Sequence, residues 1–313
     1  MIRYVKEFSG NDVIYCPNPG NAGDSILAHV THRLLRRAGL QYHTVQWSEQ
    51  FSSEGKIILY GGGGNLTDEY SRARHFIERH HQGAHRLAVL PHTVQGHAGL
   101  LQNLGANVDI FCRERRSYEW VSRQTQQANV YLADDLAFRL DVETVLDGEM
   151  EAIALGGEIG KVLFRALWNR YIGGGFTKKV PPLQAAVEQG GQALQQLVKP
   201  SKQHSCLYAL REDLEQEGGK SPAGNVDLSQ VFAYGTASAS VAEQATRAML
   251  SYLNRFERIK TNRLHICIPA ALLGKQVDFY ANSYFKNEAI YEHSIAGSYP
   301  NVRWSGVWRG GDE

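Results

Sequence analysis

Apolar residues in the first half of the chain form short continuous runs, and helical patterns separate these runs. Such runs are expected when a strand is buried on both faces of a parallel sheet. Between them, apolar residues recur at helical spacing, as in Ile26, Val30 and Leu34. The alternation predicts an open α/β sheet with helices on both faces. The predicted strands are 12–16, 56–60, 86–90, 108–112 and 129–132, and the predicted helices are the stripe at 26–35, 67–81 and 114–125.

The alternation stops near residue 141 and resumes near residue 206. The interval holds glycine and proline clusters, which indicate a connection with some helix in it. Strands are then predicted at 206–210, 263–268 and 276–280, with a helix between the first two whose apolar face runs from Val241 to Phe256. We therefore predict two Rossmann-like domains with a ligand cleft between them. The predicted boundaries are 1–145 for the N-terminal α/β domain, 146–203 for a linker or insert, and 204–313 for the C-terminal α/β domain.

Composition and charge narrow the function. The 313 residues carry 33 Lys and Arg against 32 Asp and Glu, a formal net charge of +1. Bulk charge therefore does not favour nucleic acid as a partner, and any anion must be held by a local cluster. No sequence segment reaches the roughly 20 apolar residues that span a bilayer, and the charged first residues are unlike a signal peptide. The four cysteines form no CxxC pair, which favours buried thiols in a reducing cytoplasm over a metal site or disulfide framework.

The segment after the first predicted strand is 17–25, PNPGNAGDS. Its glycines suit a tight turn, and Asp24 or Ser25 is placed to cap the following helix. The free N–H groups of that helix can face an anion. A purely structural turn is the alternative, because such turns occur in every α/β domain.

Four successive glycines, 61–64, follow the second predicted strand and precede Asn65. Four glycines are costly in conformational entropy, so their presence indicates that the backbone passes close to a ligand, with tight packing as the alternative. The run is not a dinucleotide fingerprint, because Leu66 stands where the third glycine is needed. It is not a P-loop either, because no Gly-Lys-Ser/Thr follows.

Three further strands of the first half are each followed by polar residues. His92 comes after 86–90, at a position where a structural and a functional role are equally favoured. Arg113 comes first in an arginine cluster after 108–112 and is the one placed to point into a cleft. Asp134 and Asp135 follow 129–132, where helix capping is the simplest account.

The second half offers a separate set of candidates. Arg211 follows the apolar run CLYAL. Arg263 and His265 lie two apart, so they share a face if their run is a strand, and at a helix start they can still converge on one anion. Lys286 and Tyr291 are weaker candidates, because a solvated helix face explains them equally well.

Taken in order, these segments resemble the polysaccharide pyruvyl transferase family over about residues 15–292. Each motif alone is weak, whereas the ordered set is specific. The motifs are GNAGD at 20–24, GGGGNL at 61–66, LPHTV at 90–94, FCRE at 111–114, ALREDLE at 209–215, TNRLHI at 261–266, and the late Lys286 with Tyr291. The resemblance implies a two-domain fold like that of B-type glycosyltransferases. It also implies transfer of the enolpyruvyl part of phosphoenolpyruvate onto two hydroxyls of one sugar, giving a pyruvate ketal on an exopolysaccharide or capsule precursor.

The resemblance and the residue types together predict a role for each candidate residue in the reaction. The resemblance implies that the donor is bound by Arg113, Arg263, Leu264 and His265, with His92 beside them. To the donor side we add Gly62, Gly63 and Asn65, and we assign acceptor contacts to Asn21, Asp24 and Arg211. His265 is the preferred acid or phosphate partner, and Asp24 and His92 are candidate bases. The scheme needs phosphoenolpyruvate as a substrate, with no metal and no further cofactor.

Two other functions stay open. A nucleotide-sugar-dependent glycosyltransferase of the same fold would also hold phosphates at glycine-rich turns and arginines, but it should show a late acidic residue for the ribose, and only Glu288 and Glu292 follow Lys286 before the last few residues. A glycan-binding protein with a degenerate site is disfavoured by the intact Arg113 and Arg263.

The segment 161–179, KVLFRALWNRYIGGGFTKK, mixes basic, aromatic and aliphatic residues. A helix packed across the two domains, or an oligomer contact, is the favoured interpretation. A helix lying at the inner face of the membrane, close to a lipid-linked oligosaccharide acceptor, is the alternative. The sequence thus predicts a cytoplasmic enzyme, with peripheral membrane contact through 161–179 left open and the oligomeric state unassigned.

Overall fold

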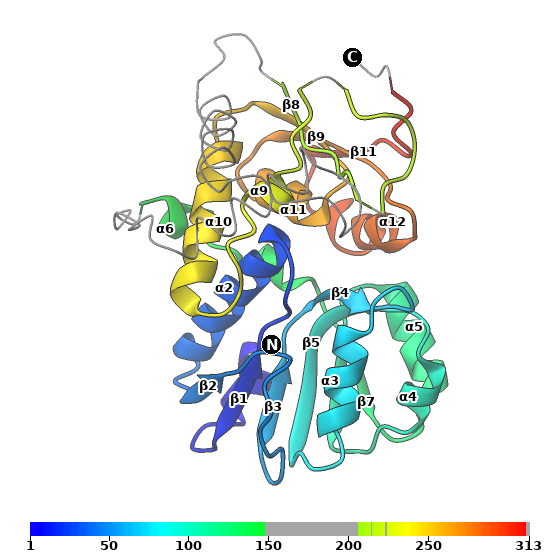
Figure 1. Cartoon of the computed structure of the whole chain (residues 1–313). Helices are drawn as coiled ribbons and strands as arrows, with labels where there is room; N and C mark the ends of the chain where they lie inside the picture. The colour runs from blue at the N-terminus through cyan, green and yellow to red at the C-terminus, as the bar shows by residue number, and fades with distance from the viewer. Residues whose placement is uncertain (148–205, 214, 223, 311–313) are drawn as a thin grey trace, which may run out of the picture.

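All strands of the structure lie in two parallel sheets (Figure 1). The structure is a computed structural model and describes residues 1–147, 206–213, 215–222 and 224–310. The larger sheet has the order β2-β1-β3-β5-β6-β7, with β4 paired to β5, and the smaller has the order β11-β10-β9-β8. The strands are β1 Val13–Cys16, β2 Tyr42–Thr44, β3 Ile57–Tyr60, β4 Gly63–Leu66, β5 Arg86–Val94, β6 Val108–Cys112, β7 Asn129–Leu132, β8 Cys206–Tyr208, β9 Arg258–Thr261, β10 Gln276–Phe279 and β11 Val302–Trp304.

Helices connect the parallel strands, as parallel pairing requires. The α-helices are α1 Ile2–Lys6, α2 Ala22–Arg37, α3 Arg72–His80, α4 Ala98–Gln102, α5 Arg115–Gln124, α6 Val142–Asp147, α9 Leu228–Val231, α10 Ala239–Leu253, α11 Leu264–Leu272 and α12 Lys286–Ile290. Two short turns of other helix types are η1 Leu136–Arg139 and η2 Tyr291–Ile295.

The strands β1, β3, β5 and β6 of the larger sheet are buried on both faces, which explains why they are nearly continuous apolar runs. Val13 and Tyr15 of β1 belong to a core shared with α2, whereas Ile14 and Cys16 point to the opposite face. That opposite face packs against α3, α4 and α5. The predicted α/β sheet with helices on both faces is therefore confirmed.

The core on the α2 face continues into the second half of the chain. It includes residues of α10, α11 and the strands of the smaller sheet. α2 and α10 lie side by side in Figure 1, and the Ser25 hydroxyl of α2 donates to the Gly235 carbonyl just before α10 at 3.0 Å. The two sheets are thus joined by a buried apolar interface beside the helices that carry site residues.

Most predicted elements are confirmed, with corrected boundaries. β5 continues to Val94 beyond the predicted 86–90, so His92 lies inside the strand instead of after it. The prediction for 67–81 is too long, because α3 begins only at Arg72. Three short strands, β2, β4 and β11, were not predicted, since they are polar, rich in glycine, or only three residues long.

The prediction of a strand at 263–268 is wrong. The strand is β9, Arg258–Thr261, and the run that follows it is helix α11. The residues of α11 are almost entirely apolar and buried, so they lack the polar stripe that marks a surface helix. A short buried helix and a buried strand have the same hydrophobic pattern. Here the strand ends at Thr261, before the predicted run begins at Arg263, and the apolar run itself is the start of α11.

The segment 161–179 lies outside the described residues, so its packing or membrane contact stays a prediction. Among the residues that the structure does describe, every helix is too short or too polar to cross a membrane.

Candidate functional site

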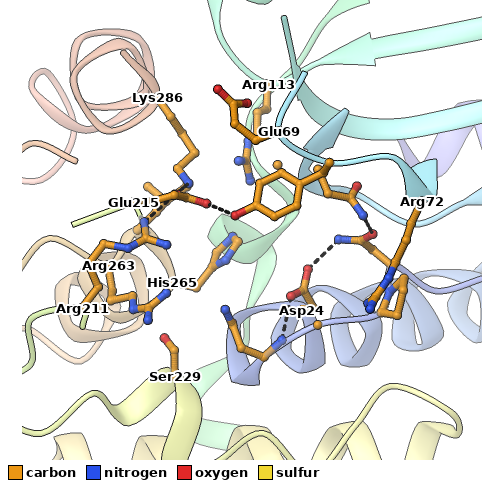
Figure 2. A pocket seen from close by; sticks show the side chains of 18 of the residues that line it. Asp24, Glu69, Arg72, Arg113, Arg211, Glu215, Ser229, Arg263, His265 and Lys286 are labelled. Atoms are coloured by element: carbon orange, nitrogen blue, oxygen red, sulfur yellow. Dashed lines mark hydrogen bonds and ion pairs between the residues drawn. The ribbon is translucent and has the colours of Figure 1, made fainter. Parts of the chain in front are cut away.

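A polar cavity of about 390 Å³ lies between the two sheets, at the carboxyl ends of their strands. From the larger sheet it is lined by the loop after β1 with the start of α2, by β4 and the loop after it, and by Arg113 after β6. From the smaller sheet it is lined by the segment after β8 and by α9, α11 and α12. Figure 2 shows His265 between Asp24 on one side and the arginines of the smaller-sheet half on the other. The lining residues are Asn18, Pro19, Gly20, Asn21, Asp24, Gly64, Asn65, Glu69, Tyr70, Ser71, Arg72, Arg113, Arg211, Glu215, Ser229, Arg263, Leu264, His265 and Lys286.

The first wall is the start of α2. Asn21 is the N-cap, accepting from the Gly23 N–H at 2.8 Å, while the Asp24 carboxylate accepts from the Asn21 N–H at 2.9 Å. This is a reciprocal capping box, so the prediction that Asp24 or Ser25 is the cap is wrong by one turn. Asp24 instead turns its carboxylate toward the cavity. Burial raises the pKa of Asp24, and the charge of His265 and the Asn18 hydrogen bond offset only part of the effect.

The glycine run packs closely against the protein itself. A Cβ at Gly61 would lie 2.5 Å from the Asn18 backbone nitrogen, and one at Gly62 would lie 2.8 Å from the Pro91 carbonyl oxygen. At Gly63 it would meet the Asn18 side chain at 2.5 Å. Gly64 is the member of the run that also lines the cavity, and a Cβ there would lie 2.7 Å from Arg113 Nη2. Tight packing, the alternative weighed from the sequence, thus accounts for three of the four glycines.

A chain of amide hydrogen bonds runs from Asp24 into the larger sheet. Asn18 Nδ2 donates to Asp24 Oδ1 at 2.6 Å, and Asn65 Nδ2 donates to Asn18 Oδ1 at 2.6 Å. The side-chain oxygen Oδ1 of Asn65 in turn lies 2.9 Å from His92 Nε2. His92 is fully buried and does not line the cavity, and burial lowers its pKa to about 3. It is therefore neutral near pH 7 and reaches Asp24 only through the two asparagines.

Arg113 is a buried cation at the end of β6. Its Nε donates to the Thr93 hydroxyl at 2.8 Å and its Nη1 to Asp135 at 2.7 Å. The residue is 1% exposed and Asp135 0%, so the ion pair is fully buried. Burial alone would raise the pKa of Asp135, but the charges of His265 and Arg113 hold it well below its ordinary value. Asp135 does cap η1, as the capping account suggested, and it also neutralises Arg113.

The facing wall is the start of α11. Arg263 is its N-cap residue, and its guanidinium contacts Asp227 and, at 2.8 Å, Asp213. His265 is the second residue of α11, with a non-helical φ/ψ of −83° and 16°, and its Nε2 lies 3.3 Å from Asp135 Oδ2. Arg263 and His265 thus converge as residues of a helix start, the second of the two geometries considered for them.

A charged cluster completes the smaller-sheet side. Glu215 accepts from Arg211 Nη1 at 2.5 Å, from Lys286 Nζ at 2.8 Å and from the Tyr70 hydroxyl at 2.6 Å. Burial would raise the pKa of Glu215, but Lys286 and Arg211 keep it well below its usual value. Burial lowers the pKa of Lys286 to about 8, despite the attraction of Glu215. Because Tyr70 follows β4, this cluster ties the two halves together across the cavity.

The structure brings most of the predicted site residues to one cavity. Those that line it are Asn21, Asp24, Asn65, Arg113, Arg211, Arg263, Leu264 and His265. Gly62, Gly63 and His92 lie behind its wall. Lys286, a weaker candidate, also lines it, whereas Tyr291 packs against Trp304.

The sequence analysis did not single out the segment 69–72 or three acidic partners of the cations, Asp213, Glu215 and Asp227. It named Asp135 only as a helix cap. The segment sits in a stretch predicted to be helical, where charged residues are expected to be solvated. Glu215 is the last residue of the ALREDLE motif, so the motif itself could have indicated that this carboxylate lies at the site. Among the described residues, no group of three His, Cys, Asp or Glu side chains converges as a metal site would require.

Comparisons with known proteins agree with this architecture. No protein-family model matches the chain. The chain is 22% identical to a Bacillus subtilis (strain 168) protein named "Putative pyruvyl transferase EpsO", over 97% of this chain and 94% of that protein. It also superposes on a crystal structure of a functionally uncharacterised Klebsiella pneumoniae protein with a TM-score of 0.70 and 27% identity, covering 98% of this chain and 96% of the other. The similarity to the Bacillus protein suggests a transferase.

Proposed function

We propose that the protein transfers the pyruvyl group of phosphoenolpyruvate to two hydroxyls of a sugar, forming a pyruvate ketal on an exopolysaccharide or capsule precursor. One observation carries the proposal: Arg113, Arg211, Arg263 and Lys286 converge from both sheets on one cavity beside His265. The name of the Bacillus relative and the ordered motifs support the same reaction.

The arrangement of the chain fits the proposal. We propose that the two sheets are the cores of two Rossmann-like domains, 1–145 and 204–313, arranged as in B-type glycosyltransferases. Their strands end at the cavity, which is where open parallel sheets bind ligands. The buried contact between α2 and α10 then holds the two halves of the molecule in a fixed relative position.

The donor demands concentrated positive charge. Phosphoenolpyruvate carries about three negative charges near neutral pH on its carboxylate and phosphate. Arginine forks bind both groups through paired hydrogen bonds. Arg113 and Arg263 would take the donor from opposite sides of the cavity, with Leu264 offering its backbone at the start of α11. Lys286 and Arg211 supply the remaining cationic charge near the leaving phosphate.

The reaction needs one acid and one base. An acid protonates the methylene carbon C3, and a sugar hydroxyl attacks C2, which gives a tetrahedral intermediate that still bears phosphate. A second hydroxyl then displaces the phosphate and closes the ketal. Of the two hydroxyl protons, one replaces the proton delivered to C3 and the other leaves with phosphate. His265 is the proposed acid, and Asp24, whose raised pKa suits proton exchange, is the proposed base.

We propose that the acceptor binds at the start of α2, across the cavity from Arg211 and Arg263 (Figure 2). Asn21 and Asp24 present an amide and a carboxylate there, and Tyr70 adds an aromatic ring that is 39% exposed. Amides, carboxylates and an exposed ring are suited to the hydroxyls and the apolar face of a sugar. Arg211, assigned to the acceptor from the sequence, lies instead in the cluster with Lys286 and Glu215, so we propose that it serves the donor.

Phosphate release tests the function directly. The protein is incubated with phosphoenolpyruvate and a panel of sugars and lipid-linked oligosaccharides, and products are analysed by mass spectrometry. We expect phosphate release that depends on the acceptor, and a product carrying one pyruvate ketal. Calorimetry should show phosphoenolpyruvate binding that Arg263→Ala weakens by about 1.5–3 kcal/mol and that Arg263→Lys also weakens. Binding of a nucleotide sugar instead of phosphoenolpyruvate would overturn the proposal.

A further inference from the structure

We infer that Asp135 is a positioning residue that fixes the tautomer of His265, so that Nδ1 is the ring nitrogen that exchanges the proton in the reaction. The inference rests on the proposed function for the identity of that reaction. The geometry itself does not depend on it, because it concerns one buried carboxylate and the two cationic groups that it contacts.

Each oxygen of Asp135 has an assigned partner. Oδ1 accepts from the Ala137 N–H at 2.8 Å, and Oδ2 accepts from Arg113 Nη1 at 2.7 Å. The same Oδ2 lies 3.3 Å from His265 Nε2. The side chain is 0% exposed, so water does not compete for these contacts. Arg113 and Asp135 follow strands of the larger sheet, whereas His265 belongs to α11, so the carboxylate connects the two sides of the cavity.

A carboxylate can only accept hydrogen bonds, and this determines where the imidazole proton sits. Neutral His265 must carry its proton on Nε2 to bond Asp135, which leaves Nδ1 as the proton acceptor. Nδ1 faces the start of α2, where a Cβ at Gly23 would lie 2.5 Å from it. Only a glycine at this position lets the Nδ1 edge of the ring pack against the start of α2, close to Asp24. In the reaction, Nδ1–H of protonated His265 passes its proton to C3, and Nδ1 is reprotonated by the proton that Asp24 takes from the attacking hydroxyl.

Asp135→Asn reverses this arrangement with little change of shape. The Ala137 N–H keeps the amide oxygen at the position of Oδ1, so the amide NH₂ takes the position of Oδ2. There it donates to His265 Nε2 and moves the neutral imidazole proton to Nδ1, while Arg113 Nη1, which donates to Oδ2 in the wild type, loses its carboxylate partner. Asp134→Asn is the matched control, because Asp134 is the adjacent aspartate, is exposed, and accepts from the Ser294 hydroxyl at 2.9 Å.

The experiment reads the tautomer and the rate separately. Long-range ¹H–¹⁵N spectra of the full chain, with the His265 signals assigned by their loss in His265→Gln, should show the Nε2-protonated form in the wild type and the Nδ1-protonated form in Asp135→Asn. With phosphoenolpyruvate and a working acceptor, kcat of Asp135→Asn should fall at least tenfold. The calorimetric Kd for phosphoenolpyruvate is measured alongside, because the substitution also removes the carboxylate partner of Arg113. Asp134→Asn should match the wild type in all three measurements.

A double-mutant cycle distinguishes positioning from support of the fold. If Asp135 acts through His265, Asp135→Asn lowers kcat no further in the His265→Gln background. An equal loss of kcat in both backgrounds, or a wild-type His265 with its neutral proton on Nδ1, would overturn the inference. The wild-type spectrum decides even if Asp135→Asn does not fold. If the spectra show the expected tautomers but the protein releases no phosphate from phosphoenolpyruvate, the proposed function is wrong and the inference about the tautomer stands.

Discussion

Two carboxylates flank His265, and their surroundings drive their pKa values apart. Asp135 is buried beside Arg113 and His265, and these charges hold its pKa below the ordinary value against the effect of burial. Asp24 accepts mainly from neutral amides, so burial prevails and raises its pKa. Groups separated in this way divide the work of acid–base chemistry. The comparison indicates that Asp135 stays ionised and holds its neighbours, whereas Asp24 is the carboxylate able to exchange a proton.

The largest effect should follow from removing the cation beside Asp135. Arg113→Ala leaves a fully buried carboxylate without its guanidinium partner, so the free energy of unfolding should fall by about 3–5 kcal/mol. Urea denaturation measures this loss. Arg113→Lys is the control: it keeps the charge, so it should retain more stability while still weakening phosphoenolpyruvate binding. A loss below about 1 kcal/mol for Arg113→Ala would mean that Asp135 is not held by this pair.

The second effect concerns the other carboxylate and should appear in rate instead of stability. Asp24→Asn should lower kcat about 100-fold or more if Asp24 is the base. The free energy of unfolding should change by only about 0.5–1.5 kcal/mol, because the amide oxygen still accepts one of the two hydrogen bonds that Asp24 receives from Asn18 Nδ2 and the Asn21 N–H. Steady-state kinetics and urea denaturation are measured on the same preparation. If Asp24→Asn loses stability but keeps its kcat, Asp24 has the structural role that we assign to Asp135 and is not the base.

The two walls of the site differ in how far the sequence could predict them. Asp24, Asn65 and Arg113 follow strands with clear apolar runs, so their shared edge follows from parallel topology alone. Asp135 was placed at that edge too, but its pairing with His265 depends on how the two halves pack, which periodicity does not encode. The residues of α11 were predicted to form a strand because a helix that is apolar on all sides has no polar stripe to identify it.

The pKa of Lys286, unlike that of the two carboxylates, predicts how phosphoenolpyruvate affinity depends on pH. Burial lowers the pKa of Lys286 to about 8, so its charge is present below that pH and lost above it. Phosphoenolpyruvate affinity should therefore fall as pH rises through about 8, on the order of tenfold for one charge-assisted contact. Calorimetry from pH 7 to 9 measures it, and Lys286→Arg should flatten the profile. Because the folded pKa lies below the unfolded value near 10.4, stability from this group rises over the same range, so unfolding does not explain the loss.

The smallest effect should come from a carboxylate that water screens. Glu288 on α12 pairs with Arg116 on α5 at 3.1 Å, and both side chains are about half exposed. Like the contact of Asp135 with His265, this pair bridges the two halves, but exposed ion pairs contribute only about 0–1 kcal/mol. Arg116→Ala should therefore change the free energy of unfolding by less than about 1 kcal/mol and leave phosphoenolpyruvate affinity unchanged.

A double-mutant cycle of Arg116→Ala with Glu288→Ala, repeated at high salt, isolates the pair itself. A coupling well above 1 kcal/mol that survives salt would show that the exposed bridge, and not burial alone, holds the walls of the cavity together. A coupling near zero leaves that role to the buried contacts, since Asp135 and the α2–α10 packing are shielded from solvent in a way that Glu288 is not. Burial, and not the mere presence of an ion pair, would then distinguish the contacts that hold the two walls of the cavity together from the surface ion pairs that contribute little stability.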